Sequence, residues 1–436
     1  MSTVPHASIP RLPLRTIHVE VVEGVDRGKH ATGDRLSIGT AEGNDLRLTD
    51  PKVSRFHVEL GAAGGAVRVR DLGSTNGTRV GVVRLERGEI ALGASIELGQ
   101  SRLVIRDAEL VTVESASEPR FGPLIGASAC MRRLAARLGK VAAADTSVLL
   151  VGESGTGKEL AAQAIHEGSA RASEPFVVVD CGAIAPSLVA SELFGHERGS
   201  FTGADRTSHG AFERVKRGTI FIDEVGELPL ALQASLLGVL ERRRFRRVGG
   251  DRDLTTEARV IAATNRDLRE EVNAGRFRLD LYYRLAVVTL ELPPLRERTD
   301  DLPMLLEHFL RELGSSAEVE DVFSTETIAE LERHPFPGNV RELRNLVEAT
   351  LTLGEAPVLA HPRPASAPAL PDAVTDALLD LPFRDAKREL VDGFERRYVT
   401  RWLERTHGNV AQAARDTGLD RSYLTDLVRK HGLREK

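Results

Sequence analysis

Short stretches in which apolar and polar residues alternate follow one another between residues 16 and 106. They read TIHVEVV, DRLSIG, NDLRL, HVEL, AVRVRDL, SIELG and RLVIR, with Gly, Asn and Asp between them. Alternation with a period of two is typical of strands that bury one face, so the pattern predicts an all-β sandwich. Because the alternation is lost from residue 107, we expect the first domain to cover residues 1–110 and a linker to cover residues 111–121.

Apolar runs without alternation replace this pattern farther along the chain. SVLLVG, PFVVVD, TIFID and RVIAAT stand between helical stretches, which is typical of parallel strands buried on both faces of an α/β sheet. We expect this α/β domain over residues 122–354. The proline- and alanine-rich residues 355–378 predict an extended linker, and residues 379–436 predict an all-helical domain. The chain is therefore expected to be multidomain.

The overall composition favours a folded, cytoplasmic protein. Charged residues make up 28% and hydrophobic residues 41% of the chain, which are ordinary fractions for folded domains. The spacing of Cys130 and Cys181 argues against a disulfide framework and a zinc site. The N-terminus lacks an apolar signal region, and no stretch approaches the roughly 18 apolar residues of a membrane span. We therefore expect neither export nor a membrane partner.

A glycine-rich loop stands between an apolar run and a helical stretch. VLLV leads into VGESGTGKE and then into ELAAQAIH. This order predicts a phosphate-binding loop for ATP, because backbone N–H groups then face the phosphates at a helix N-terminus; a chance glycine-rich turn is the alternative. Lys158 is expected to reach the β- and γ-phosphates. The expected nucleotide-binding residues are Gly152, Glu153, Ser154, Gly155, Thr156, Gly157, Lys158 and Glu159.

Two carboxylates end the apolar run TIFIDE. We expect Asp223 to bind Mg²⁺ and Glu224 to orient or deprotonate the attacking water; two surface acids at a strand end are the alternative. Glu159 stands where Ser or Thr usually supplies a magnesium-binding hydroxyl, so metal binding depends more on Asp223. The run RVIAATN ends in Thr264 and Asn265, which we expect on the γ-phosphate side.

Several motifs in one fixed order resemble a known family. GESGTGKE, SELFGHERGSFTGA, GTIFIDE, FRRVGG, AATNRDL, FRLDLYYRL and PFPGNVRELRN resemble the AAA+ domain of bacterial enhancer-binding activators of sigma-54 RNA polymerase, almost continuously over residues 122–354. The resemblance implies a P-loop ATPase fold with a helical lid. It also implies a homo-oligomer, from a dimer to a hexameric ring.

The resemblance gives a role to a glycine-flanked loop. In that family the loop touches sigma-54, which implies the polymerase holoenzyme as a partner and Phe201 and Thr202 as contact residues. Glycines allow such a loop to change conformation when ATP is bound or cleaved. Ser200 replaces the usual Ala, and an ordinary turn with Phe201 folded back is the alternative. The expected contact residues are Gly199, Ser200, Phe201, Thr202, Gly203 and Ala204.

Other roles follow from the same resemblance by position. Arg278 and Arg284 resemble the arginine fingers that reach the γ-phosphate of a neighbouring subunit, and Arg341 resembles the arginine that senses nucleotide within its own subunit. Surface ion pairs are the alternative for all three. Asp180 replaces an Asn that holds the catalytic glutamate in check, and a carboxylate would repel that glutamate. Residues 242–247, RRRFRR, resemble a second pore-facing loop, with a nucleic-acid patch as the alternative.

The C-terminal residues 408–433 have helix-turn-helix spacing and resemble the Fis-type DNA-binding domain. Asp420 is expected as the N-cap and residues 421–431 as the recognition helix, with a plain helical hairpin as the alternative. An upstream apolar stripe predicts pairing with a second copy or packing within one subunit; it comprises Leu390, Phe394, Tyr398 and Trp402. The residues expected on bases are Arg421, Ser422, Tyr423 and Thr425, and those on phosphates are Arg429 and Lys430.

Three motifs of the first domain, IG, SRFH and GSTNG, resemble the forkhead-associated (FHA) domain, a reader of phosphothreonine. The resemblance implies a phosphothreonine-containing partner made by a Ser/Thr kinase, in two-component-like signalling. Thr40 stands where the family usually has a phosphate-binding Arg, and we expect Arg55 to substitute for it. The expected residues are Ser54, Arg55 and Thr75 on the phosphate, Asn76 on the peptide backbone, and His57 and Gly39 in support; turn residues are the alternative.

Together these features predict an ATP hydrolase coupled to transcription activation. It would bind DNA enhancer sites, remodel sigma-54 polymerase to open promoters and respond to phosphothreonine. One alternative is an AAA+ protein remodeller of another class, which the GSFTGA loop and the helix-turn-helix spacing disfavour. Another is an FHA adaptor with a vestigial ATPase, which the intact Lys158, Asp223 and Glu224 disfavour.

Overall fold

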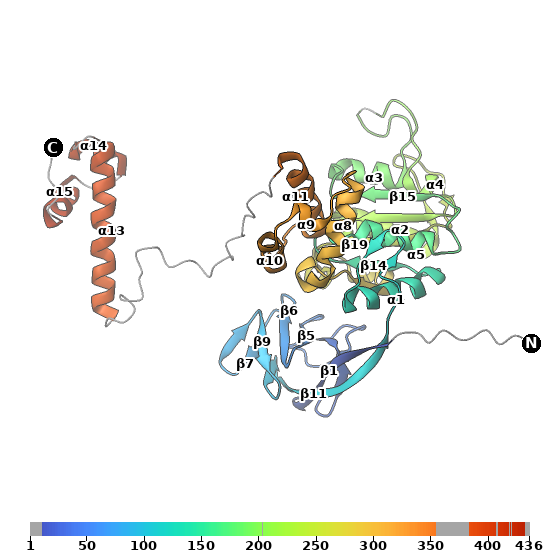
Figure 1. The fold of residues 1–436 in the computed structure, drawn as a ribbon, viewed down its shortest axis with the longest axis horizontal. Helices are drawn as coiled ribbons and strands as arrows, with labels where there is room; N and C mark the ends of the chain where they lie inside the picture. The colour runs from blue at the N-terminus through green and yellow to red at the C-terminus, as the bar shows by residue number, and fades with distance from the viewer. Residues whose placement is uncertain are drawn as a thin grey trace, which may run out of the picture. The chain divides into compact units, whose positions relative to one another are not determined.

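The computed structural model of the chain describes residues 11–202, 204–354, 383–406, 409–417, 419 and 421–431. The chain divides into two compact units, Met1–Ala360 and His361–Lys436. The first unit holds a β-sandwich and an α/β domain with a helical lid, and the second unit is helical (Figure 1). The predicted multidomain fold class is confirmed.

The sandwich consists of two sheets packed face to face. One has the strand order β2-β1-β11-β10-β7-β8 and the other β4-β3-β5-β6-β9. In β6, Val67 and Val69 are buried while Arg68 between them is exposed, so the alternation in the sequence does place one face in the core. The strands are β1 Arg11–Glu23, β2 His30–Gly33, β3 Arg35–Gly39, β4 Leu46–Arg47, β5 Val58–Ala63, β6 Ala66–Asp71, β7 Thr78–Val80, β8 Val83–Leu85, β9 Arg87–Ala91, β10 Ser95–Leu98 and β11 Ser101–Glu114.

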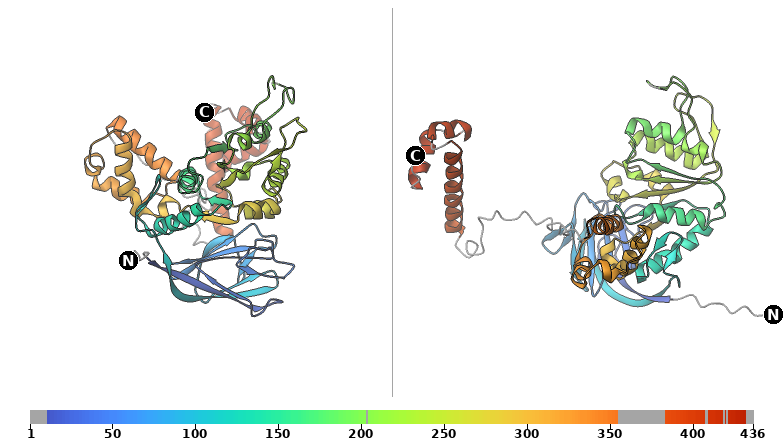
Figure 2. Two further views of the ribbon diagram at one scale, coloured as in Figure 1. Left: turned by 90° about the vertical axis from the view of Figure 1, so that its right-hand side faces the viewer. Right: turned by 45° about the horizontal axis from the view of Figure 1, so that its top comes forward.

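Strands β1 and β11 are longer than the sequence pattern predicted. β11 continues to Glu114, antiparallel to the start of β1, with Arg11 opposite Glu114 and Leu14 opposite Val111 (Figure 2). The strand therefore continues past residue 107, where the alternation ends, and into the first residues of the predicted linker 111–121. This end of the ribbon buries neither face, because Leu110 on one face is 70% exposed and Val111 on the other is 42% exposed. A strand without a buried face needs no alternation.

The α/β domain is built on a five-stranded parallel sheet with the order β15-β16-β19-β14-β20. In β16, Ile220 and Ile222 pack with α3, α5 and α7, whereas Phe221 packs on the other face with α1 and α2. Burial on both faces was predicted from the unbroken apolar runs and is confirmed. The strands are β14 Val148–Val151, β15 Phe176–Asp180, β16 Thr219–Asp223, β19 Arg259–Thr264 and β20 Val288–Glu291.

Helices cover both faces of this sheet and form the lid. The lid has its own core, in which Leu306, Phe336 and Leu343 are fully or almost fully buried. Two short hairpins, β12 Arg120–Phe121 with β13 Leu124–Ile125 and β17 Arg244–Phe245 with β18 Leu254–Thr255, complete the domain. The helices are α1 Ala129–Ala143, α2 Lys158–Glu167, α3 Pro186–Phe194, α4 Ala211–Arg214, α5 Leu230–Arg242, α6 Leu268–Asn273, α7 Leu279–Leu285, α8 Leu302–Glu312, α9 Val319–Val322, α10 Thr325–Arg333 and α11 Asn339–Leu353.

The described part of the second unit holds three helices around one small core. They are α13 Phe383–Arg405, α14 Val410–Thr417 and α15 Arg421–Lys430. Val399 from α13, Ala413 from α14 and Leu424 from α15 are completely buried together. The predicted linker 355–378 lies outside the described residues. None of the helices in the described part of the chain has the length and apolar character needed to cross a bilayer.

Candidate nucleotide site and the loops around it

The predicted catalytic residues lie at the carboxyl edge of the parallel sheet. Asp180 at the end of β15 is directly opposite Asp223 at the end of β16. The glycine loop follows Val151 in β14, whose neighbour β19 ends at Thr264. Because all these strands run in parallel, their polar ends meet at one edge, as the sequence predicted.

The glycine loop has the conformation that its sequence requires. Gly155 has φ +78°, and a Cβ there would lie 2.2 Å from the carbonyl oxygen of Gly338. Gly157 has φ 102° at the N-cap of α2. The Lys158 ammonium donates to the carbonyls of Gly152 at 3.0 Å and of Glu153 at 3.3 Å. The loop thus curls around its own lysine, at the N-terminus of a helix that favours anions.

Asp223 and Glu224 lie beside this lysine. Oε1 of Glu224 is 3.6 Å from the Lys158 ammonium, and its Oε2 accepts the backbone N–H of Asn265 at 3.1 Å. Burial raises the pKa of the Asp223 carboxyl, and the charge of Asp180 adds to that increase. Glu224 has φ 49°, a backbone conformation that is uncommon for residues with a side chain.

The carboxylate of Asp180 bonds to backbone groups of its own turn. Its Oδ1 accepts the N–H groups of Gly182 at 2.8 Å and Ala183 at 3.0 Å, so it closes its own turn. The charge of Asp180 also affects the neighbouring Cys181. Burial, together with the carboxylates of Asp180, Asp223 and Glu224, raises the pKa of the Cys181 thiol to about 12. That cysteine is a protonated, buried thiol and not a nucleophile.

The first turn of α11 seals one side of the glycine loop. Arg341, the predicted nucleotide sensor, donates to the hydroxyl of Ser154 in the glycine loop at 2.9 Å. Asn339 donates to the Glu153 carboxylate at 3.1 Å and to the Ser154 carbonyl at 3.0 Å. Arg296 pairs with the same carboxylate through two hydrogen bonds, and this pairing lowers the pKa of Glu153.

Sequence reasoning missed Asn339 and Arg296 as site residues. Asn339 lies in the quoted motif PFPGNVRELRN, and its φ of 52° lets it face the loop. Arg296 lies shortly after a proline pair, and no local motif indicates its partner Glu153, which is 143 positions away. Glu153 was predicted only as a member of the loop, whereas the structure makes it the link between the loop and the lid.

The two predicted finger arginines lie at opposite ends of α7. Arg278 is its N-cap and forms a two-bond ion pair with Asp280, at 2.7 and 3.0 Å. Arg284 lies in the last turn and donates to the carbonyl of Leu240 at 3.0 Å. Both side chains are therefore held by groups of their own subunit.

The GSFTGA loop projects beyond the sheet between α3 and α4 (Figure 1). The N–H of Gly199 donates to the carbonyl of Ala204, which closes the loop at its base. Thr202 is exposed, while the Phe201 ring is 36% exposed and meets His196 edge-on at 5.0 Å. The Phe201 ring thus packs partly against its own domain and leaves part of its surface exposed to solvent. Ser200 is half-buried, and Gly203 lies outside the described residues.

The predicted second loop, residues 242–247, runs from the last residue of α5 into β17, and ion pairs hold two of its arginines, Arg246 and Arg247. Phe245 belongs to the domain core. Arg247 binds the carboxylates of Glu197 and Glu213, which flank the GSFTGA loop on either side, and this contact lowers the pKa of Glu213 to about 2. Arg246 pairs with Asp253. Arg247 therefore links this segment to the GSFTGA loop, while Arg242, Arg243 and Arg244 are exposed.

The predicted phosphopeptide residues come together at one end of the sandwich. Oγ of Ser54 accepts the N–H of Thr75 at 3.0 Å, and the Asn76 amide donates to the carbonyl of Lys52 at 2.7 Å. The Arg55 side chain is exposed and Thr40 half-buried.

Two further residues support these loops from beneath. His57 is buried, its Nδ1 accepts the N–H of Ser54, and burial lowers its pKa so that it stays neutral. A Cβ on Gly39 would lie 2.1 Å from the carbonyl oxygen of Arg55, so no larger residue fits there.

The predicted DNA-contacting residues lie on α15. Ser422 and Tyr423 are exposed, Thr425 is half-buried and Arg429 is exposed. The side chain of Arg421 and the residues Gly408, Gly418 and Asp420 lie outside the description, as do the side chains of Leu390 and Phe394. In the remainder of the stripe, Tyr398 and Trp402 lie 6.5 Å apart and Trp402 packs against the core of the unit.

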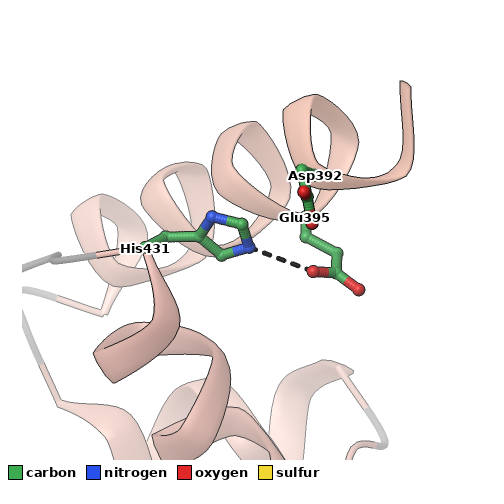
Figure 3. Close-up of side chains that lie close together, drawn as sticks. All are labelled: Asp392, Glu395 and His431. Carbon is green, nitrogen blue, oxygen red and sulfur yellow. Dashed lines mark hydrogen bonds and ion pairs between the residues drawn. The ribbon is translucent and has the colours of Figure 1, made fainter. Parts of the chain in front are cut away.

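Lys430 differs from the expected phosphate contact. Its ammonium lies 2.6 Å from Asp392 and 2.8 Å from Glu395 in α13. His431 also reaches Glu395 at 3.0 Å (Figure 3). This cluster fastens α15 to α13, and the ammonium already pairs with both carboxylates that could otherwise hold a cation.

Comparisons with known proteins agree with this geometry. A family model described as the sigma-54 interaction domain matches residues 124–291, and an AAA+ ATPase lid domain matches residues 296–363. Residues 20–109 match a model described as the cytoplasmic domain of an inner membrane component of a type III secretion system.

Individual relatives extend over most of the chain. The transcriptional regulatory protein ZraR of Salmonella typhimurium is 42% identical over 311 residues, which cover 71% of this chain and 69% of that protein. The crystal structure of NtrX from Brucella abortus in complex with ATP is 32% identical, with a TM-score of 0.50, and covers 71% of this chain and 70% of that chain. A solved FHA domain is 30% identical with a TM-score of 0.20 and covers 22% of this chain and 99% of that domain. The chain belongs to the family of sigma-54-dependent transcription activators, and it is an AAA+ ATPase.

Proposed function

We propose that this protein opens promoters for sigma-54 RNA polymerase by ATP hydrolysis while bound to upstream DNA, under the control of a phosphothreonine signal from a Ser/Thr kinase. The sandwich of residues 1–110 would read the signal, residues 122–354 would hydrolyse ATP, and residues 379–436 would bind DNA. The observation that supports this proposal best is the meeting of Lys158, Glu224 and Arg341 at the carboxyl edge of the sheet.

The residues at this edge suit attack by water on the γ-phosphate. Lys158 would exchange the carbonyls of Gly152 and Glu153 for phosphate oxygens and thereby leave Glu224. The Glu224 carboxylate would then take a proton from the attacking water as the bond between the γ-phosphorus and ADP breaks. Asn265 holds Glu224 in place through its backbone N–H, and Arg341 would report the presence of phosphate to the lid.

The charges at Asp223 suit a magnesium ion. Burial and the neighbouring Asp180 raise the pKa of the Asp223 carboxyl and so disfavour its ionised form. A divalent cation bound there would favour the ionised form again. Asp223 would hold Mg²⁺, directly or through water, and the ion would neutralise phosphate charge. Glu159 is exposed in the first turn of α2 and could supply a second carboxylate.

The finger arginines support an oligomer, from a dimer to a hexameric ring. Arg278 and Arg284 are exposed at the two ends of α7, and an arginine supplied by a neighbour would stabilise the charge of the transition state. The ion pair of Arg278 with Asp280 is local and exposed, so this side chain could be drawn to a phosphate at small cost. Arg284 would first have to leave the carbonyl of the buried Leu240.

The GSFTGA loop, helix α15 and the loops of the sandwich would bind the macromolecular partners of the protein. Phe201 and Thr202 offer an apolar ring and a hydroxyl at the tip of a projecting loop, for contact with sigma-54. The exposed residues of α15, including Tyr423 and Arg429, would enter the DNA major groove. Ser54, Arg55 and Thr75 would bind the phosphate of a phosphothreonine peptide.

In vitro transcription with purified components tests the proposed function. Sigma-54 holoenzyme on a promoter with upstream binding sites should form open complexes with this protein and ATP, and none with a non-hydrolysable ATP analogue. ATP hydrolysis without open complexes at any promoter bound by the protein in a genome-wide occupancy map would contradict the proposal.

A further inference from the structure

A hydrophobic contact joins the recognition loops of the sandwich to the ATPase domain. Phe56, which is 2% exposed, follows directly after Arg55, yet it packs with the core of the ATPase domain and not with that of the sandwich. Its ring meets the edge of Tyr282 in α7, with ring centroids 5.3 Å apart and an angle of 70°. Leu72, from a second recognition loop, is buried in the same cluster. The recognition end of the sandwich is thus also its docking end.

Asn273, the last residue of α6, bonds to both recognition loops. Its Nδ2 donates to the carbonyl of Phe56 at 2.5 Å and to that of Leu72 at 2.8 Å, and its Oδ1 accepts the N–H of Phe56 at 3.5 Å. The Tyr283 hydroxyl donates to the carbonyl of Glu42 in a third loop. The hydrogen bonds of the Asn273 amide can therefore form only at one spacing of the two loops. We call the contact made by Glu42, Phe56, Leu72, Asn273, Tyr282 and Tyr283 the dock.

Ion pairs make this contact specific. Arg269 in α6 lies 2.7 Å from Glu59 of the sandwich and 2.6 Å from Asp267, and all three side chains are less than 20% exposed. Arg70 of the sandwich lies 2.7 Å from Glu270. Separation of the domains must return these charges to water or leave them unpaired, which disfavours other, misaligned contacts.

The groups expected to bind phosphate lie within three positions of the dock. Ser54 is two residues before Phe56, and Thr75 is three residues after Leu72. Ser54 Oγ now accepts the N–H of Thr75. A phosphate that took both groups would replace that bond and change the spacing between the two loops that Asn273 bridges.

The dock also covers the middle of the finger helix. Tyr282 and Tyr283 lie between Arg278 and Arg284 in α7, and each arginine is held by a group of its own domain. A finger must turn toward the nucleotide of a neighbouring subunit, so a contact that fixes α7 opposes that movement. The dock therefore holds α7, and any change in the recognition loops on peptide binding would reach the same helix.

With the sandwich taken as a phosphothreonine reader, as proposed above, we propose that the dock represses ATP hydrolysis by holding α7, and that a phosphothreonine peptide releases it. The docked and the peptide-bound conformations use the same two loops and exclude one another. A peptide that binds the released conformation better shifts the population toward it.

Steady-state ATP turnover by the full chain tests this proposal. The variants are Phe56→Ala, Asn273→Ala and the control Val83→Ala, whose side chain is 57% exposed on β8 of the sandwich. The probe is a peptide mixture with a central phosphothreonine and random flanks, beside its unphosphorylated counterpart. We expect the phosphorylated mixture to raise turnover of the unmodified chain and of Val83→Ala about fivefold or more. Phe56→Ala and Asn273→Ala should reach that rate without peptide and respond no further.

Two separate readouts keep the outcomes distinct. Thermal melting establishes that the variants are folded, and hydrogen exchange of the α7 amides should be faster in both dock variants than in Val83→Ala. Equal or lower turnover in folded Phe56→Ala and Asn273→Ala overturns the repressing dock. If no phosphopeptide binds to the unmodified chain, phosphothreonine reading is contradicted but repression by the dock is not. Repression is tested separately, by the turnover of Phe56→Ala and Asn273→Ala without peptide.

Discussion

The Lys158 ammonium lies 3.6 Å from the carboxylate of Glu224. The cation expected to bind phosphate and the carboxylate expected to activate water thus share one ion pair. Lys158 is 6% and Glu224 20% exposed in their side chains, so the pair is only weakly screened by solvent. Any phosphate that attracts Lys158 changes the surroundings of Glu224 at the same time.

Replacement of Glu224 should separate ATP binding from hydrolysis. Glu224→Gln should retain ATP binding but lose turnover by on the order of 10²–10⁴-fold, because an amide cannot accept the proton of water. Glu227→Gln is the control, since Glu227 is three positions away and pairs with Arg266 at the surface. Turnover comparable to that of the unmodified chain, measured at saturating ATP, would rule out Glu224 as the base.

Mixing of inactive variants should reveal whether the fingers act between subunits. Arg278→Ala and Arg284→Ala should each abolish turnover. Either one mixed with Glu224→Gln should regain part of it, because some interfaces then combine an intact finger with an intact glutamate. Titration of the mixing ratio at a fixed total concentration measures this, and the absence of rescue in confirmed oligomers would contradict fingers in trans.

Thr202 should matter for promoter opening and not for turnover. Thr202→Ala should keep ATP turnover within about twofold and abolish open-complex formation, because the loop projects away from the sheet edge. Thr207→Ala is the matched control in the same α3–α4 connection, where the hydroxyl bonds to Glu197. Normal opening by Thr202→Ala, scored by permanganate footprinting, would exclude it as a sigma-54 contact.

Arg55 should carry most of the phosphate affinity of the sandwich. Loss of one charge-assisted contact costs about 1.5–3 kcal/mol, so Arg55→Ala should weaken binding of a phosphothreonine peptide roughly tenfold to a hundredfold. Thr40→Arg should strengthen it. Arg106→Ala, which removes only a strand ion pair with Glu20, is the control. Equal affinity of the full chain for phosphorylated and unphosphorylated peptides, by calorimetry, would show that the sandwich does not read phosphate.

Gly39 should be indispensable to the recognition loops for a steric reason. A Cβ there would lie 2.1 Å from the carbonyl oxygen of Arg55, so Gly39→Ala should destabilise the sandwich by about 1–3 kcal/mol and impair peptide binding. Gly61→Ala on β5 is the control, because its Cβ would have 4.0 Å to the nearest neighbour, the carbonyl oxygen of Asp34. Chemical denaturation compares the two, and equal stability would refute the steric requirement.

The sequence by itself determined the order of the domains, the kind of sheet in each and the chemistry of the glycine loop. These features are local: side-chain alternation reports one buried face, an unbroken apolar run reports two, and Gly155 and Gly157 permit backbone conformations within a few residues of Lys158. The convergence of Asp180, Asp223 and Thr264 was also predictable. Parallel strands bring their carboxyl ends to one edge whatever their surroundings.

Only the tertiary structure decided which distant surfaces meet. Phe56 reads as one more apolar residue of the sandwich, and nothing near it in sequence announces Tyr282 or Asn273, 217 positions from its backbone. Arg296 and Glu153 likewise pair across 143 positions, and Lys430, predicted to contact phosphate, pairs with Asp392 of α13. Such contacts depend on the complementary shape and charge of two complete surfaces, and a pattern with a period of two or 3.6 residues carries no information about them.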